Sequence, residues 1–173
     1  NYLNADTYLV SNWNDRLKKL KNKFNIGVSW KSFKNRYSRE KSLELNDFNK
    51  ILKNKKFNFI NMQYGDVREE IKKYNEETEN KIISFNDLDL FNNFDQIAAL
   101  LKNLDLFISV SNSTAHLAGS LGVKTLLIKP PKHAVFHYWY QSDHKTPWYK
   151  SIDLIEKENL KEGSKLLSKY FDL

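Results

Sequence analysis

The chain has 173 residues, no cysteine and a formal net charge of +7, from 28 Lys and Arg against 21 Asp and Glu. This length supports one substantial hydrophobic core, and the lack of cysteine excludes a disulfide framework and thiolate metal sites. The sequence contains no run of about eighteen apolar residues and no secretory leader, so we expect a cytoplasmic protein without a membrane span. The positive charge suits an anionic ligand, although lysines scattered over solvated faces are its simpler explanation, and a nucleic-acid surface is less favoured.

Two regions are expected along the chain. Residues 1–23, with a helix predicted over Asn12–Asn22, resemble a linker or helix that continues from a missing upstream region. Residues 24–173 are expected to form a single Rossmann-like domain. We therefore interpret the sequence as a fragment of a longer protein.

Strand and helix signals alternate through this second region. Apolar, β-rich runs predict strands at Phe24–Trp30, Phe57–Gln63, Lys81–Phe85, Leu106–Val110, Lys124–Ile128 and Ile152–Ile155. Apolar residues at helical spacing predict helices at Asp47–Asn54, Asp66–Glu77, Phe94–Leu104 and Asn159–Phe171. The alternation predicts βαβ units with right-handed crossovers, and hence an α/β, Rossmann-like three-layer sandwich with a mostly parallel sheet.

Four loops are expected at one edge of that sheet. In a parallel sheet, ligands bind beyond the carboxyl ends of the strands, near the point where the strand order reverses. The loops that follow the predicted strands are Ser29–Lys41, Gln63–Asp66, Asn86–Phe91 and Ser111–His116. The candidate site is therefore expected where these loops meet.

The segment Leu104–Gly122 (LDLFISVSNSTAHLAGSLG) carries the strongest functional signal. An apolar strand is followed by short polar residues and then by a small-residue helix that opens on Asn112, Ser113 and Thr114. Free N–H groups at such a helix start form an anion site suited to phosphate. His116 shares the helix face of Asn112 and Ser113, which favours a ligand contact over the alternative of a buried or capping imidazole.

Several other chemistries lack their motifs. The loop after the first strand has no glycine, which argues against an NAD-type site, and no P-loop or GxSxG nucleophile elbow occurs. His133 and His137 are four residues apart but have no partnering carboxylate motif, and HExxH is absent. We therefore expect no metal and no cofactor.

Two further loops are notable for composition. The first is basic, and Lys41 is its favoured ligand-binding member; its basic residues are Lys31, Lys34, Arg36, Arg39 and Lys41. The second, from His133 to Tyr149, is aromatic. In that loop we interpret Trp139, Trp148 and Tyr149 as packing residues in preference to a base-stacking platform.

Taken in order, the motifs resemble those of a known family. They are GVSW after a strand, SREKSLEL, FINMQYGD, the segment from Asp87 to Ile128, and PWY. This order resembles the carboxyl-terminal, donor-binding half of GT-B glycosyltransferases, and in particular the heptosyltransferase-like proteins, including those that carry tetratricopeptide repeats upstream. The resemblance extends from about Tyr2 to Ile155.

The resemblance implies a role for each matching position. It implies catalytic roles for His116 and Lys41 beside the donor phosphates, and substrate binding by Ser29, Gln63, Ser111, Asn112, Ser113 and Thr114. One departure is visible, because many relatives have Asp where this chain has Ser111. The implied partners are a nucleotide-sugar donor and the upstream domain of the same protein, without nucleic acid.

The sequence thus predicts the donor-binding domain of a glycosyltransferase that moves a sugar from a nucleoside diphosphate to an acceptor without a metal. The fragment alone is expected to be inactive, because the general base would lie outside it. Two alternatives stay open: a sugar-nucleotide epimerase-like domain, and a non-catalytic binding module. The nucleotide base, the sugar and the acceptor are not specified.

Overall fold

A computed structural model describes residues 2–22, 24–33, 38–131, 139 and 146–171. Within these ranges six strands form one sheet in the order β3-β2-β1-β4-β5-β6, and every neighbouring pair is parallel. The strands are β1 (Phe24–Ser29), β2 (Phe57–Asn61), β3 (Ile82–Ile83), β4 (Leu106–Val110), β5 (Thr125–Ile128) and β6 (Ile152–Ile155). The expected parallel α/β sheet is confirmed.

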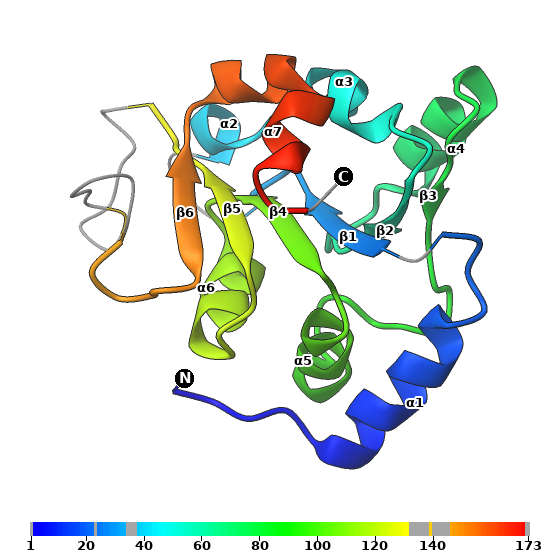
Figure 1. Ribbon diagram of the computed structural model, residues 1–173, viewed down its shortest axis with the longest axis vertical. Helices are drawn as coiled ribbons and strands as arrows, with labels where there is room; N and C mark the ends of the chain where they lie inside the picture. The colour runs from blue at the N-terminus through cyan, green and yellow to red at the C-terminus, as the bar shows by residue number, and fades with distance from the viewer. Residues whose placement is uncertain (1, 23, 34–37, 132–138, 140–145, 172–173) are drawn as a thin grey trace.

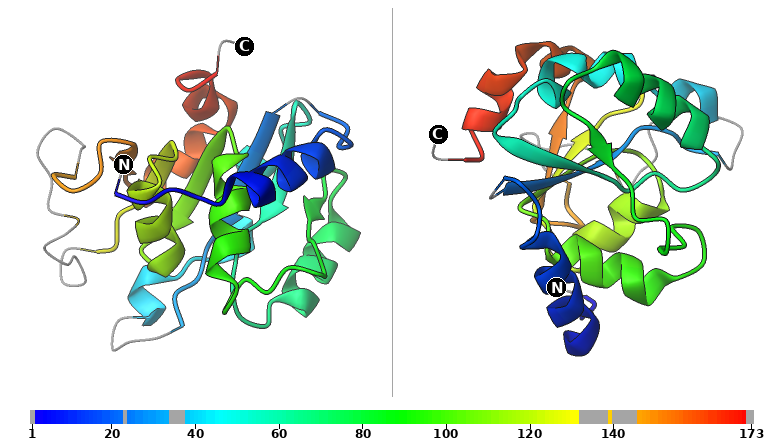
Figure 2. Two further views of the ribbon diagram at one scale, coloured as in Figure 1. Left: turned by 90° about the horizontal axis from the view of Figure 1, so that it is seen from below. Right: turned by 90° about the vertical axis from the view of Figure 1, so that its right-hand side faces the viewer.

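Helices cover both faces of the sheet, so the domain has three layers (Figures 1 and 2). One face carries η1 (Leu45–Phe48), α3 (Asn49–Leu52), α4 (Arg68–Glu77), η4 (Lys157–Glu162) and α7 (Ser164–Ser168). The other face carries α1 (Thr7–Leu17), α5 (Phe94–Lys102) and α6 (Ser113–Ser120). The central strand β4 is buried along its whole length, which explains its continuous apolar sequence.

The first helix differs from its predicted position. It runs from Thr7 to Leu17 because Asp6 caps it, its side chain accepting a hydrogen bond from the Leu9 N–H at 2.9 Å. Trp13 and Leu17 are buried in the same apolar cluster as α5. The helix before the sheet is therefore packed into the core of the domain.

The last predicted helix is divided. Residues 157–162 form η4 and residues 164–168 form α7, with Gly163 between them at φ 57°. A left-handed backbone at this position ends the first segment and redirects the chain. None of the described helices is long and apolar enough to cross a membrane.

A short helix, α2 (Ser38–Lys41), follows the carboxyl end of β1 and brings Lys41 to the edge of the sheet where the predicted loops gather.

Candidate functional site

The site lies between the carboxyl ends of β1 and β4. These two strands are neighbours in the sheet, and Ser29 at the end of β1 is in register with Ser109 of β4. From β1 the chain proceeds to β2 on one side, while β4 leads to β5 on the other. This reversal of strand order is the position where open parallel sheets bind ligands.

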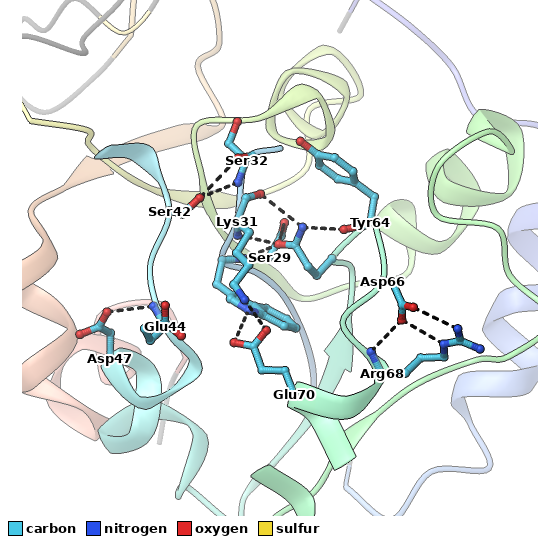
Figure 3. A network of polar contacts seen from close by, with 12 residues as sticks. Ser29, Lys31, Ser32, Ser42, Glu44, Asp47, Tyr64, Asp66, Arg68 and Glu70 are labelled. Atoms are coloured by element: carbon cyan, nitrogen blue, oxygen red, sulfur yellow. Dashed lines mark hydrogen bonds and ion pairs between the residues drawn. The ribbon is translucent and has the colours of Figure 1, made fainter. Parts of the chain in front are cut away.

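A buried hydrogen-bond network forms the floor of the site (Figure 3). Oε1 of Gln63 accepts hydrogen bonds from Ser29 Oγ at 3.0 Å, Trp30 N at 2.8 Å and Lys31 N at 2.7 Å. Its Nε2 donates to the carbonyl oxygens of Tyr64 at 2.8 Å and Lys31 at 3.3 Å. Gln63 therefore fixes the first loop against the end of β2.

Asn112 joins this floor to α6. Its Nδ2 donates to Ser29 Oγ at 2.8 Å, and its Oδ1 accepts from the Ala115 N–H at 3.0 Å, capping the helix. One side chain thus sets the start of α6 relative to β1. The predicted helix start at Asn112 is where the structure has it.

A cavity of about 550 Å³ opens above this floor. Six of the eight predicted site residues line it together, and they are Lys41, Ser111, Asn112, Ser113, Thr114 and His116. Ser29 and Gln63 are not among its lining residues; both are buried, and their polar groups bond to the protein. All four predicted loops contribute to the wall, as expected from the strand order.

Among the described basic residues of the first loop, Lys41 lines the cavity. Its side chain is only 4% exposed, and burial lowers the pKa of its ammonium group. The Lys31 ammonium forms an ion pair with Glu70 at 2.6 Å, and Arg39 is exposed. Lys34 and Arg36 lie outside the described residues.

His116 is held by aromatic neighbours. Its Nδ1 lies 3.1 Å from the Tyr149 hydroxyl, and its ring stacks on Trp139 with the ring centroids 4.6 Å apart. Burial, and secondarily the charge of Lys41, lowers the pKa of His116. The indole N–H of Trp139 donates to Ser111 Oγ at 2.7 Å, so Ser111 is tied to the same group.

The electrostatics of the cavity favour an anion. Lys41 and His116 each pay a desolvation cost for carrying charge, and Lys41 also disfavours the charge of His116. The N-terminus of α6 adds the positive end of a helix dipole on the same wall. A bound anion would stabilise the charged forms of Lys41 and His116 and would also interact favourably with the N-terminus of α6.

A larger cavity of about 740 Å³ adjoins the first. It lies beside α4 and the segment 84–91, and Gln63 borders it. Leu90 and Phe91 line both cavities, so the two are neighbours along the carboxyl edge of the sheet.

Several residues of the site carried no signal in the sequence. Ser32 and Phe91 line the smaller cavity from two of the predicted loops and Phe94 from a predicted helix, but nothing in the local pattern singles out these three residues. Trp139 is buried, as predicted for a packing residue, whereas Trp148 is half-exposed. The described residues contain no group of three or more His, Cys, Asp or Glu that could hold a metal, while His133 and His137 lie outside them.

The strand order defines a Rossmann-like α/β domain, and a cavity lies at the edge where that order reverses. No protein-family model matches the sequence. Among curated proteins, the chain is 31% identical over 155 residues to Protein FlbA of Caulobacter vibrioides, across 87% of this chain and 25% of that protein.

Two solved structures share the fold. A glycosyl transferase of family 9 from Veillonella parvula superposes with a TM-score of 0.66 at 14% identity, over 97% of this chain and 54% of that one. The ADP-heptose lipopolysaccharide heptosyltransferase II of E. coli gives 0.64 at 13% identity, over 96% and 53%. The expected heptosyltransferase-like fold is confirmed, and the chain spans about half of each structure and a quarter of the curated relative.

Proposed function

We propose that this chain binds the nucleoside diphosphate of an activated sugar, as the donor-binding part of a glycosyltransferase. The observation that carries the proposal is the cavity at the reversal of strand order, where Lys41, His116 and the start of α6 converge. The fold that the chain shares with two glycosyltransferases supports it.

The hydrogen-bond donors on the wall of the smaller cavity suit a diphosphate leaving group. When the bond between sugar and phosphate breaks, negative charge grows on the phosphate oxygens. Fixed donors that already point at that position stabilise the developing charge without reorganisation. Lys41, His116, Ser113 and Thr114 line the cavity, and together with the N–H groups at the start of α6 they would serve as donors of this kind. They would replace a metal ion.

The larger cavity gives the rest of the donor a place to bind. It meets the smaller cavity at Leu90 and Phe91, and it combines apolar residues such as Ile71 with polar ones such as Asn75. A nucleoside has the same mixed character. In this arrangement the diphosphate occupies the smaller cavity and the nucleoside extends toward α4. The base that takes the proton of the acceptor lies outside this chain.

The direct test is calorimetric titration with UDP, GDP and ADP, each alone and as a sugar conjugate. We expect at least one to bind, and Lys41→Met to weaken that binding at least tenfold, because a charge-assisted hydrogen bond is lost. Lys53→Met removes the same charge from an exposed position after α3 and serves as the matched control. No binding at millimolar concentration would contradict the proposal.

The reaction product distinguishes glycosyl transfer from epimerisation and from binding without catalysis. Incubation of the full-length protein with the bound sugar nucleotide and a candidate acceptor should release nucleoside diphosphate together with a glycosylated acceptor. An epimerised sugar nucleotide as the product would point to the epimerase alternative. Tight binding with neither product, across the acceptors tried, would favour a non-catalytic binding module.

A further inference from the structure

Two aromatic side chains hold His116 on the wall of the smaller cavity; together they are called the aromatic clamp (Trp139 and Tyr149). Trp139 stacks on the imidazole with an interplanar angle of 22°, and Tyr149 meets it edge-on at 66°. Such contacts fix the plane of the ring. The Tyr149 hydroxyl also approaches Nδ1 at 3.1 Å, so one ring nitrogen has a defined neighbour.

The clamp is itself rigidly placed. Trp139 is 1% exposed, and its indole N–H donates to Ser111 Oγ. The Tyr149 ring lies directly against the backbone of α6, because a Cβ added at Gly119 would come within 2.5 Å of its Cγ. The Tyr2 ring packs edge-on against the Tyr149 ring at a centroid distance of 6.2 Å. Tyr149 therefore cannot easily turn away from His116.

The direction of the hydrogen bond decides which nitrogen carries the proton. Among the described residues, Nδ1 of His116 is the hydrogen-bond partner that the structure gives to the Tyr149 hydroxyl. A phenol hydroxyl with one such partner donates to it, since its O–H is a better donor than its oxygen is an acceptor. A neutral imidazole that accepts at Nδ1 carries its hydrogen on Nε2.

We propose that Tyr149 is a positioning residue that holds His116 as the neutral Nε2–H tautomer, so that Nε2 donates a hydrogen bond to a phosphoryl oxygen in the cavity. This inference rests on the proposed function for the identity of the ligand, but the tautomer itself does not depend on it. Trp139 and Ser111 keep the imidazole plane in place, and Tyr149 sets which edge of the ring donates.

Removal of the Tyr149 hydroxyl tests the proposal, because the direction in which the pKa of His116 changes depends on whether that hydroxyl donates or accepts. A donor to Nδ1 stabilises the neutral ring and lowers the pKa, whereas an acceptor from Nδ1–H stabilises the charged ring and raises it. In Tyr149→Phe the aromatic packing stays, so the pKa of His116 should rise if Tyr149 donates. Lys41, whose charge also lowers the pKa of His116, is unchanged in this variant.

The measurement is a nitrogen-15 NMR titration of the imidazole in the ligand-free protein, with His116→Gln to assign the signal. We expect the shifts of the parent to show a protonated Nε2 and an accepting Nδ1, and the pKa to rise in Tyr149→Phe. Tyr8→Phe removes a hydroxyl from a 72% exposed tyrosine on α1 and is the control. A parent with its proton on Nδ1, or a pKa that falls or stays the same in Tyr149→Phe, would overturn the proposal.

Ligand affinity gives an independent readout. Above the pKa of His116, Tyr149→Phe should bind inorganic pyrophosphate or the preferred nucleoside diphosphate about three- to tenfold more weakly, the range of one hydrogen bond. Below that pKa the imidazolium carries a hydrogen on both nitrogens, and the difference should shrink. Equal loss at both pH values would reflect general damage and contradict the positioning role. If the parent binds no phosphate ligand, the proposed function fails while the NMR result still decides the tautomer.

Discussion

Burial lowers the pKa of both Lys41 and His116 in the ligand-free protein, and the charge of Lys41 lowers the pKa of His116 further. A bound diphosphate acts in the opposite direction, since an anion favours the charged form of each. Binding and protonation are therefore coupled at this site.

The coupling predicts a pH dependence with a definite sign. The complex binds more protons than the free protein between the lowered and the restored pKa values, so affinity should rise as pH falls through that window. For His116 the window begins below its ordinary value of 6.5. Calorimetry in two buffers of different ionisation enthalpy should detect proton uptake on binding, and His116→Gln should reduce it. Net proton release from the protein would contradict this account.

Gln63 illustrates a residue that serves the site without lining the smaller cavity. Its oxygen accepts three hydrogen bonds and its amide donates two. A carboxylate at this position could still accept the three hydrogen bonds, but it could not donate the other two. It would also place a buried negative charge beneath the proposed anion site.

Gln63→Glu is therefore expected to lower the free energy of unfolding by about 1–3 kcal/mol near neutral pH. Burial should raise the pKa of the new carboxyl, so the lost stability should return as pH falls and the group becomes neutral. Urea unfolding at several pH values measures both effects. The control is Gln96→Glu, where the oxygen bonded to the Trp13 indole N–H is only partly buried. An equal, pH-independent loss in both variants would be evidence against this role of Gln63.

At the scale of secondary-structure elements, the close packing of α6 against Tyr149 and Ile152 requires a residue without a side chain at position 119. Gly119, which has no side chain, allows the backbone of α6 to approach the Tyr149 ring closely. A methyl group there would meet the Tyr149 ring at 2.5 Å and Ile152 at 2.9 Å.

Gly119→Ala should consequently destabilise the domain by about 1–3 kcal/mol through overpacking, despite the better helix propensity of alanine. The Tyr149 ring should shift, and the His116 imidazole signals should move with it. Ser120→Ala, one residue further along the same helix, adds no such contact and is the matched control. A Gly119→Ala variant as stable as the parent would show that the ring moves aside at no cost.

The bounds of helices and strands could be predicted where a short stretch of sequence determines them. The strands Leu106–Val110 and Ile152–Ile155 have the predicted bounds, because their apolar runs end at polar residues. The first helix was misplaced because the Asp6 cap was not recognised as its start. The last helix was predicted as continuous because its apolar spacing survives the interruption at Gly163.

The site was predictable only in part for a similar reason. The helix start at Asn112 and the choice of Lys41 follow from patterns within short stretches of sequence. The contacts of Gln63 with the first loop and of Tyr149 with His116 join segments more than thirty residues apart. No pattern within a short stretch of sequence predicts such pairs, so the roles of Gln63 and Tyr149 could be recognised only in the folded structure.

For the whole molecule, α1 is part of the core. Trp13 is 2% exposed, contacts Phe85 edge-on at 4.9 Å and donates to Gln96 of α5. The Arg16 guanidinium lies over the Trp13 ring and pairs with Asp87, so α1 is also tied to the segment that lines the larger cavity.

Trp13→Ala should therefore reduce the free energy of unfolding by about 3–5 kcal/mol, the usual cost of truncating a buried tryptophan. Chemical denaturation measures this value. Tyr8→Ala on the same helix removes a 72% exposed ring and should change stability little. A small loss in Trp13→Ala would mean that α1 docks only loosely on the domain.

The position of the cavity between β1 and β4 also bears on how the domain assembles. Strands β1, β2 and β3 are successive in the chain, as are β4, β5 and β6, whereas Ile26 of β1 pairs with Leu106 across the long segment that carries β2 and β3. Bringing β1 and β4 together therefore carries a large entropic cost of chain closure, and their pairing joins the two halves of the sheet along one seam. A ligand at the seam contacts residues from both halves, so its binding energy opposes their separation. Nucleotide occupancy would then protect the amides of β1 and β4 from hydrogen exchange and make the domain unfold as one cooperative unit.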